Sequence, residues 1–124
     1  MGTQTQGTLS IARIYDEVLE GPYRVLVDRL WPRGVTKERA ALDEWLKDIA
    51  PSPGLRKDFD HMESRFAAFA AAYRSELDGH HEPVEHVLDL LRSGTDVVLL
   101  YAAKDRDVNH ATVLRNYLEG RLTG

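Results

Sequence analysis

The chain contains no cysteine among its 124 residues. This absence excludes disulfide bonds, thiol nucleophiles, and zinc or iron–sulfur sites built on cysteine. Long apolar runs are missing too, since none approaches the roughly 20 residues that a membrane-spanning helix needs. We therefore expect no membrane partner.

An excess of positive charge is also missing. Lys and Arg number 16 against 20 Asp and Glu, which gives a formal net charge of -4. Nucleic-acid-binding domains are usually strongly basic, so we expect no nucleic acid as a partner. Residues 1–8 are polar and lack the apolar segment of a secretory signal. We expect a disordered N-terminal tail there and a cytoplasmic protein.

The remaining residues, 9–124, have the composition of one globular domain. The chain is 43% hydrophobic and 29% charged, and its length allows one sizeable core. Strand-like and helix-like patterns follow one another along it. This order predicts an α/β fold, with helices packed on a small mixed, mostly parallel sheet.

Three segments rich in aliphatic and β-branched residues predict strands, at 9–15, 23–30 and 95–101. The link 16–22 is too short for an ordinary parallel crossover, so the first two strands are antiparallel if they are neighbours. The second and third carry runs of aliphatics, which indicates cover on both faces. Helices separate these two, so they can lie parallel.

One long helix is predicted from Pro53, with Ser52 as its N-cap, to Asp78 before Gly79. Its apolar residues recur at spacings of three and four. They are Leu55, Phe59, Met62, Phe66, Phe69, Tyr73 and Leu77. We interpret this stripe as a surface that packs on the core.

Shorter helical segments surround the long one. Thr36 can cap a helical turn, and a helix is expected at 83–92. The last helix is expected to begin after Asn109 as N-cap and to stop at Gly120. The segment 42–49 is ambiguous: its apolar spacing fits a helix, which we prefer, and a short strand around residues 44–47 is the alternative.

Polar side chains follow the two buried strands. One group lies between Asp28 and Arg33, and the other between Tyr101 and His110. Ligands of open α/β sheets bind beyond the carboxyl ends of the strands. If these two strands are parallel, both groups meet on one rim.

The residue types at this rim suit a small anionic molecule. Arg29 and Arg33 could clamp a carboxylate or phosphate, and Lys104 would add charge. The start of the last helix also favours anions. His110 could transfer protons while Asp28 orients an arginine. No cofactor is indicated.

Structural alternatives exist for each of these residues. Asp28 and Arg29 could pair with each other, as charged groups often do without any function. His110 could be solvated, and Trp31 is of a type more often found in a core than on a ligand platform. The histidines His80, His81 and His86 show no metal-binding motif, so we predict no metal site and interpret them as a solvated helix start.

Four blocks of sequence carry a family resemblance. They are VLVDRLWPRG at 25–34, DEWLKDIAPS at 43–52, the F-x-x-F-x-x-x-Y run from Phe66, and LLYAAKD with NHA at 99–111. Together they resemble the YeaO-like branch of the domain-of-unknown-function family 488, across residues 9–119. The resemblance implies no settled function.

The resemblance does implicate particular residues. Other branches of the family carry cysteine where Tyr101 and Asn109 stand here, so their thiol chemistry cannot operate in this chain. His110 is retained. The positions matching the family's polar motifs, together with Trp31, make up the predicted site. As catalytic residues we predict His110 and Asp28, and as ligand-binding residues Arg29, Arg33, Trp31, Lys104, Asn109, Lys47 and Trp45.

Two functions compete at this point. The first is a domain, either binding or catalytic, that captures a small anion in a pocket lined by Arg29, Arg33 and His110. The second is a protein–protein or self-association module, such as a homodimer, anchored by Trp31 and its neighbours. The second requires Trp31 to be exposed in the monomer.

Overall fold

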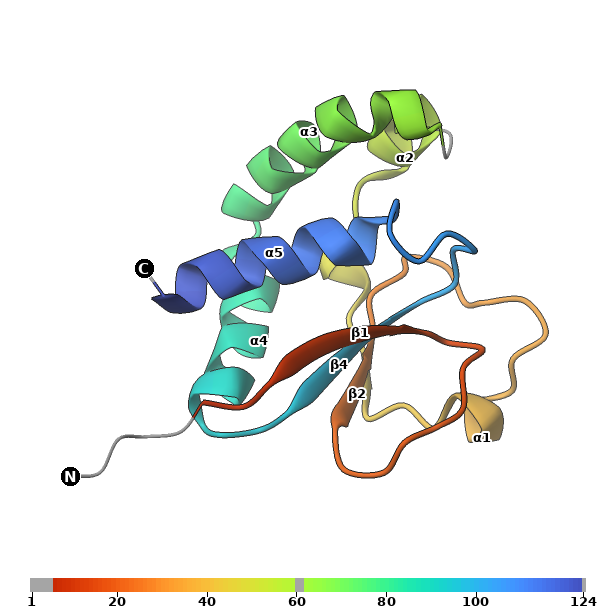
Figure 1. The fold of residues 1–124 in the computed structure, drawn as a ribbon, viewed down its shortest axis with the longest axis vertical. Coiled ribbons are helices and arrows are strands. Elements are labelled where there is room, and N and C mark those ends of the chain that lie inside the picture. The colour runs from red at the N-terminus through yellow and green to blue at the C-terminus, as the bar shows by residue number, and fades with distance from the viewer. Residues whose placement is uncertain (1–5, 60–61, 124) are drawn as a thin grey trace.

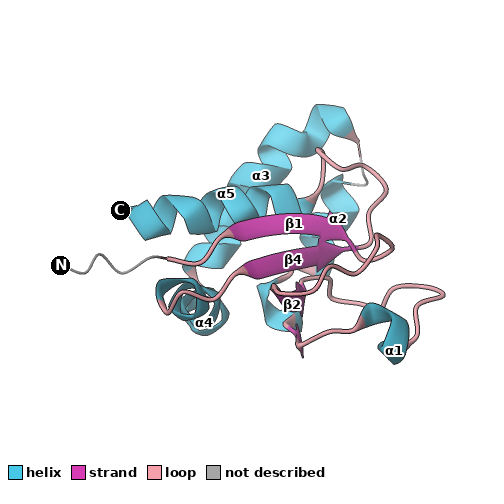
Figure 2. Ribbon diagram, turned by 60° about the horizontal axis from the view of Figure 1, so that its bottom comes forward, coloured by secondary structure: helices cyan, strands magenta, loops and turns pink. Residues whose placement is uncertain are grey.

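A four-stranded parallel sheet organises the chain (Figures 1 and 2). The computed structural model describes residues 6–59 and 62–123. The strands are β1 (Leu9–Arg13), β2 (Tyr23–Leu26), β3 (Glu44–Trp45) and β4 (Val97–Tyr101), in the spatial order β1-β4-β2-β3. Each neighbouring pair is parallel. The predicted α/β fold is confirmed, and β2 and β4 are parallel as expected.

The first two strands are not neighbours, because β4 lies between them. The condition for an antiparallel pair is therefore not met. Residues 14–22 return the chain along the sheet without a helix. Fully extended, this segment reaches about 30 Å, which exceeds the length of a five-residue strand of about 17 Å. A bare loop is thus long enough for this parallel connection.

Five α-helices occur in the described residues, and they lie unevenly about the sheet. They are α1 (Lys37–Ala40), α2 (Pro53–Phe59), α3 (Phe66–Asp78), α4 (His81–Arg92) and α5 (His110–Thr123). The larger core joins α3, α4 and α5 to one face of the sheet. The smaller core lies on the other face, beneath α1 and loops. Figure 2 shows this difference between the helical face and the loop face.

The single long helix predicted from Pro53 is wrong, because the chain forms α2 and α3 instead. The ring centroids of Phe59 and Phe69 are 4.5 Å apart. In one straight helix, ten residues would separate them by about 15 Å along the axis. The helices therefore fold back on each other around an aromatic cluster, and Met62 of the predicted stripe is exposed. Residues 60–61 lie outside the described part.

Ser52 does cap α2 as predicted, since its Oγ accepts the Leu55 N–H at 3.3 Å. Thr36 likewise caps α1 through the Arg39 N–H. The helix preferred at 42–49 is wrong, and the strand alternative holds: β3 is followed by a 3-10 turn at Lys47–Ile49. Successive strand residues point to opposite faces, and Trp45 packs into the loop-face core while Leu46 packs into the helical-face core.

The C-terminal helix of the described chain is longer than expected. Helix α5 continues through Gly120, where a stop was predicted, and Leu122 in this added turn packs against the larger core. Gly7 donates its N–H to the Leu91 carbonyl at 2.8 Å, whereas residues 1–5 of the expected tail lie outside the described part. No described helix combines the length and apolar character required to cross a bilayer.

Candidate functional site

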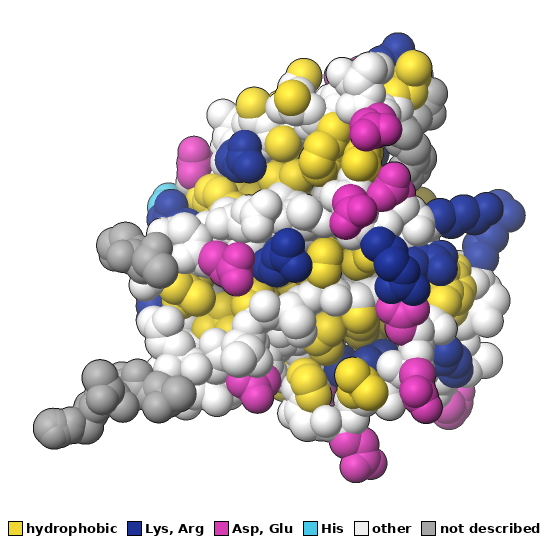
Figure 3. Space-filling model, viewed as in Figure 1, with side chains coloured by type: hydrophobic (Ala, Val, Ile, Leu, Met, Phe, Trp, Pro, Cys, Tyr) yellow, Lys and Arg dark blue, Asp and Glu magenta, His cyan; other side chains and the backbone are white. Residues whose placement is uncertain are grey.

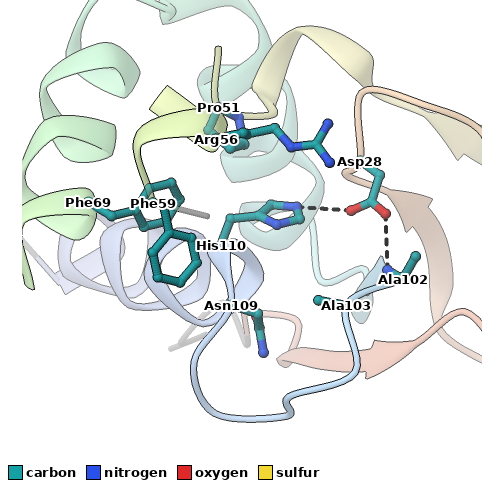
Figure 4. Close-up of a pocket in the computed structure, with 9 residues that line it drawn as sticks. All are labelled: Asp28, Pro51, Arg56, Phe59, Phe69, Ala102, Ala103, Asn109 and His110. Atoms are coloured by element: carbon teal, nitrogen blue, oxygen red, sulfur yellow. Dashed lines mark hydrogen bonds and ion pairs between the residues drawn. The ribbon is translucent and has the colours of Figure 1, made fainter. Parts of the chain in front are cut away.

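A cavity of about 240 Å³ lies beyond the carboxyl ends of β2 and β4, at the rim where the sequence predicts a site (Figure 4). It is assembled from four separate parts of the chain. Its lining residues are Asp28, Pro51, Arg56, Phe59, Phe69, Ala102, Ala103, Asn109 and His110. Of the nine predicted site residues, the cavity therefore gathers Asp28, Asn109 and His110.

Asp28 is held from several sides just after β2. Its Oδ2 accepts the Ala102 N–H at 3.0 Å, and its carbonyl accepts the Trp45 indole N–H at 2.7 Å. Its Oδ1 lies 3.0 Å from His110 Nε2. This Oδ1 is shielded from solvent and has no well-aligned hydrogen bond, so its close contact with the imidazole is electrostatic. The carboxylate thus has one oxygen committed to the backbone and one facing His110.

The surroundings of His110 determine where its proton lies. Nε2 is 3.1 Å from the Val27 carbonyl and 3.0 Å from Asp28 Oδ1. Both neighbours are acceptors, so Nε2 must carry the hydrogen. Nδ1 makes no hydrogen bond with the residues that the structure describes, and the Tyr73 ring packs edge-on at 6.4 Å between centroids. Neutral His110 therefore keeps its lone pair on Nδ1.

Arg56 is the cavity residue that the sequence analysis missed. It extends from α2 along the cavity, with its guanidinium on the same side as the Asp28 carboxylate (Figure 4). The guanidinium forms no hydrogen bond or ion pair within the described part of the chain. In a single long helix this residue would lie on the wet face, so only the fold of α2 against α3 could have indicated its place.

The opposite wall of the cavity is apolar. Phe59 and Phe69 stack there, and both are more than nine-tenths buried. Pro51, Ala102 and Ala103 add further apolar surface. The cavity thus joins a wall of aromatic and small side chains to three polar groups on Asp28, Arg56 and His110.

Asn109 borders the cavity, but its side chain is fully used by local structure. Its Oδ1 accepts the Thr112 N–H at 2.9 Å, and its Nδ2 donates to the Asp105 carbonyl at 2.8 Å. Asn109 is therefore the N-cap of α5, as predicted. Its contribution is to place His110 at the first position of that helix.

The other predicted cations lie outside this cavity. Arg29 donates to the carbonyls of Pro51 at 3.4 Å and Ala50 at 3.3 Å, and it borders a different surface depression near His80. Arg33 and Lys104 are exposed, and neither lines the cavity. Arg29 therefore holds backbone in place, and the structure does not bring the two predicted clamps together.

The two tryptophans also serve structural contacts. The Trp31 indole N–H donates to the Val35 carbonyl at 2.7 Å, and the ring meets Trp45 edge-on at 5.3 Å. Lys47 Nζ lies 4.2 Å from the centre of the Trp45 ring. Both indoles are half-buried against the loop-face core. Trp45 supports the Asp28 main chain directly, Trp31 packs on Trp45, and neither lines the cavity.

Two arginines brace the loop that follows β4. Arg13 donates through Nε to the Ala103 carbonyl at 2.9 Å. Arg106 forms a bidentate pair with Asp16, with distances of 2.7 and 2.8 Å. The hydrogen bonds from Arg106 are the main cause that lowers the pKa of Asp16 to about 2, whereas partial burial opposes them. These contacts fix the segment that supplies Ala102 and Ala103.

The Tyr73 hydroxyl beneath the cavity donates to the Ile49 carbonyl at 2.6 Å. Complete burial raises the pKa of Tyr73 well above its ordinary value. Tyr73 is therefore a neutral packing partner for His110.

The histidines near α4 have other contacts. His80 Nδ1 lies 2.9 Å from the Asp48 carbonyl, and His86 Nε2 lies 2.7 Å from Glu44 Oε1. Within the described ranges, no three His, Asp or Glu side chains converge as metal ligands would.

Figure 3 shows one face of the molecule, where basic and acidic side chains are interspersed.

Comparison with known proteins identifies the family. The Escherichia coli (strain K12) "Uncharacterized protein YeaO" is 43% identical over 107 residues, which cover 86% of this chain and 92% of that protein. The Mycobacterium tuberculosis (H37Rv) "Uncharacterized protein Rv3073c" is 37% identical over 112 residues, covering 90% and 93%. No solved structure matches. Residues 8–124 match the family described as "Inactive DUF488-N3 subclade", and the chain belongs to that family.

Proposed function

We propose that this protein is a binding domain for a small organic anion, which it holds in the cavity at the rim of the sheet. The observation that carries the proposal is Arg56. Its guanidinium borders the cavity and has no partner in the described chain. A guanidinium offers a fork of donors that matches a carboxylate or phosphate. In this proposal Arg56 takes the role that the sequence suggested for Arg33.

The size and lining of the cavity support a small ligand. Its volume of about 240 Å³ is below the roughly 300–1,000 Å³ of pockets for drug-sized molecules. Phe59 and Phe69 offer an apolar wall for the body of the ligand, and Arg56 offers a charged group for its head. A short carboxylic acid with an apolar substituent has this distribution of properties.

Binding without catalysis is the simpler form of this function. Among the described residues that line the cavity, none supplies a hydroxyl, thiol or amine nucleophile. The family description itself reads "Inactive". Asp28 and His110 therefore act in this proposal as polar groups that shape and charge the site. We further infer that the protein acts in the cytoplasm.

A thermal-unfolding experiment tests the proposal. The wild-type protein is heated with acetate, benzoate, phosphate or sulfate, beside the variants Arg56→Ala and Arg33→Ala. A probe at 100 times its Kd should stabilise the wild type by about 2.7 kcal/mol, a shift of several degrees for a domain of this size. Arg56→Ala should abolish the shift, and Arg33→Ala should retain it.

Each other outcome has a definite meaning. Loss of the shift in Arg33→Ala alone would move the site to the Trp-Pro-Arg-Gly turn. Absence of a shift with every probe, from a folded wild type, would overturn anion binding in this cavity.

A further inference from the structure

The charges around the cavity do not balance once an anion enters. Arg56 contributes one positive charge and Asp28 one negative charge, so the site is neutral when His110 is neutral. A bound anion would then leave one uncompensated negative charge beside a carboxylate oxygen that solvent does not reach. Charges in such surroundings are costly unless they are paired.

One titratable group faces this imbalance directly. His110 contacts Asp28 through Nε2, which already carries a hydrogen because its two neighbours are acceptors. A second proton can therefore be added only at Nδ1. Histidine is the side chain whose ordinary pKa of about 6.5 allows such uptake near neutral pH.

We infer that the cavity binds a singly charged anion together with one proton, which His110 takes up at Nδ1. The inference rests on the proposed anion-binding function. With His110 protonated, the site carries Arg56, His110 and Asp28 and has a net charge of plus one. A monoanion such as a carboxylate neutralises that charge, whereas a dianion such as sulfate exceeds it. The ligand class is thus a small monocarboxylate.

The other groups that face the imidazole do not offer a second proton site. From α3, Tyr73 presents its ring edge while its hydroxyl donates to a backbone carbonyl. From the loop after β4, the cavity is lined by Ala102 and Ala103, which do not titrate. From α2, Arg56 stays charged at any ordinary pH. Arg29 and Glu76 also act on Tyr73, and their opposite charges offset each other. Arg29 donates to the Pro51 carbonyl and Glu76 accepts the Ser52 N–H. His110 and Asp28 are the titratable pair at the cavity itself, and Asp28 already accepts the Ala102 N–H.

Proton linkage makes the inference measurable at the histidine itself. If an anion favours protonated His110, saturation with that anion must raise the pH at which the imidazole titrates. NMR spectra of the histidine ring signals are recorded from pH 5 to 9, with and without benzoate, acetate or sulfate. The signal of His110 is assigned by its loss in His110→Gln. His81, which is exposed on α4, serves as a reference in every sample.

The expected result is a rise of one pH unit or more in the titration midpoint of His110 with saturating benzoate, equivalent to a tenfold linkage. His81 should not move. The affinity for benzoate, read from the same spectra, should fall as pH increases, and sulfate should bind more weakly than acetate. Arg56→Ala should lose both the binding and the rise.

The failures are distinguishable. If benzoate and the other probes shift no cavity signal, the proposed function itself is wrong. If benzoate binds but the midpoint of His110 stays fixed, proton uptake is wrong and anion binding remains. If sulfate binds more tightly than acetate at pH 6, the preference for a single charge is wrong. A folded Asp28→Asn variant should show a smaller rise, because Arg56 then leaves the site with one positive charge, which a monoanion neutralises without an added proton.

Discussion

Two arginines at the same end of the sheet, Arg29 and Arg56, differ in what their donors do. Arg29 stands in the sequence motif, is half-buried and donates to the carbonyls of Pro51 and Ala50. Arg56 lies on α2, outside the sequence motif. It is exposed, and its guanidinium has no partner in the described chain. A guanidinium that closes backbone carbonyls has few donors left for a ligand. The chemistry of this rim is therefore expected from the residue that the local structure does not use.

The same division separates the remaining polar residues. Asn109, Trp31 and Trp45 each satisfy a backbone group and hold the rim in shape. In the described chain, Asp28 Oδ1 has no well-aligned hydrogen bond, and Nδ1 of His110 accepts none. Substitution should therefore separate residues whose loss costs stability from residues whose loss costs binding.

The largest effect on stability is expected at Arg24, a buried arginine on β2. Its guanidinium donates twice to the Ala40 carbonyl and once to the Ala41 carbonyl, and it is only 7% exposed. Arg24→Ala should lower the free energy of unfolding by about 3 kcal/mol, because it leaves a cavity and unpaired carbonyls. Urea unfolding measures the loss. The control variant Arg33→Ala, at an exposed residue, should change the free energy of unfolding by less than about 0.5 kcal/mol. Equal losses in the two variants would show that bonding to backbone groups does not decide which residues stabilise the fold.

A smaller loss is expected at Trp45, which holds Asp28 through its main chain. Trp45→Phe removes the indole donor to the Asp28 carbonyl and part of the contact with Trp31. We expect a loss of about 1.5 kcal/mol in the free energy of unfolding, with benzoate still able to stabilise the variant. If stability is unchanged and benzoate binding is lost, Trp45 belongs to the site.

The arginine pair gives the most direct test of the comparison. Arg29→Ala should cost about 1 kcal/mol, since its two hydrogen bonds are long and partly solvated. Arg56→Ala should change stability by less than about 0.5 kcal/mol in the absence of ligand. Chemical unfolding without ligand, followed by thermal unfolding with benzoate, should give opposite orders of effect for the two variants. If the same variant shows the larger effect in both assays, the distinction between Arg29 as a structural residue and Arg56 as a ligand-binding residue is wrong.

These contrasts show what the sequence could predict. The rim was predictable, because β2 and β4 end in polar segments and parallel strands share their carboxyl edge. Asp28 follows β2 closely, His110 opens the helix that comes after β4, and the two side chains meet. Asn109 was predictable as a cap from its residue type and position.

What the sequence could not predict depends on tertiary contacts. A stripe with spacings of three and four does not reveal that Phe59 will stack on Phe69 and fold α2 back, and Arg56 enters the cavity only through that fold. The pattern of Trp45 and Leu46 fits one helix face as well as two faces of a strand. The charge of Arg29 is visible in the sequence, but the carbonyls that engage it are not.

The smallest expected effect concerns the exposed ion pair that braces the loop after β4. Arg106 lowers the pKa of Asp16 from 3.8 to about 2. A lowered carboxyl pKa stabilises the fold above pH 3.8, and this contribution is lost as pH falls through about 2. The Asp16 and Arg106 side chains are 31% and 59% exposed, so solvent screening keeps this contribution small.

Arg106→Ala should therefore be slightly less stable than the wild type at pH 6, and most of the difference should be lost near pH 2. Urea unfolding at pH 6, 4, 3 and 2 measures it, and 1 M salt at pH 6 should reduce it. A difference that persists unchanged at pH 2 would show that Arg106 stabilises the loop by packing rather than by charge. Packing alone would then hold the loop, and the cavity wall at Ala102 and Ala103 would keep its shape even at pH 2.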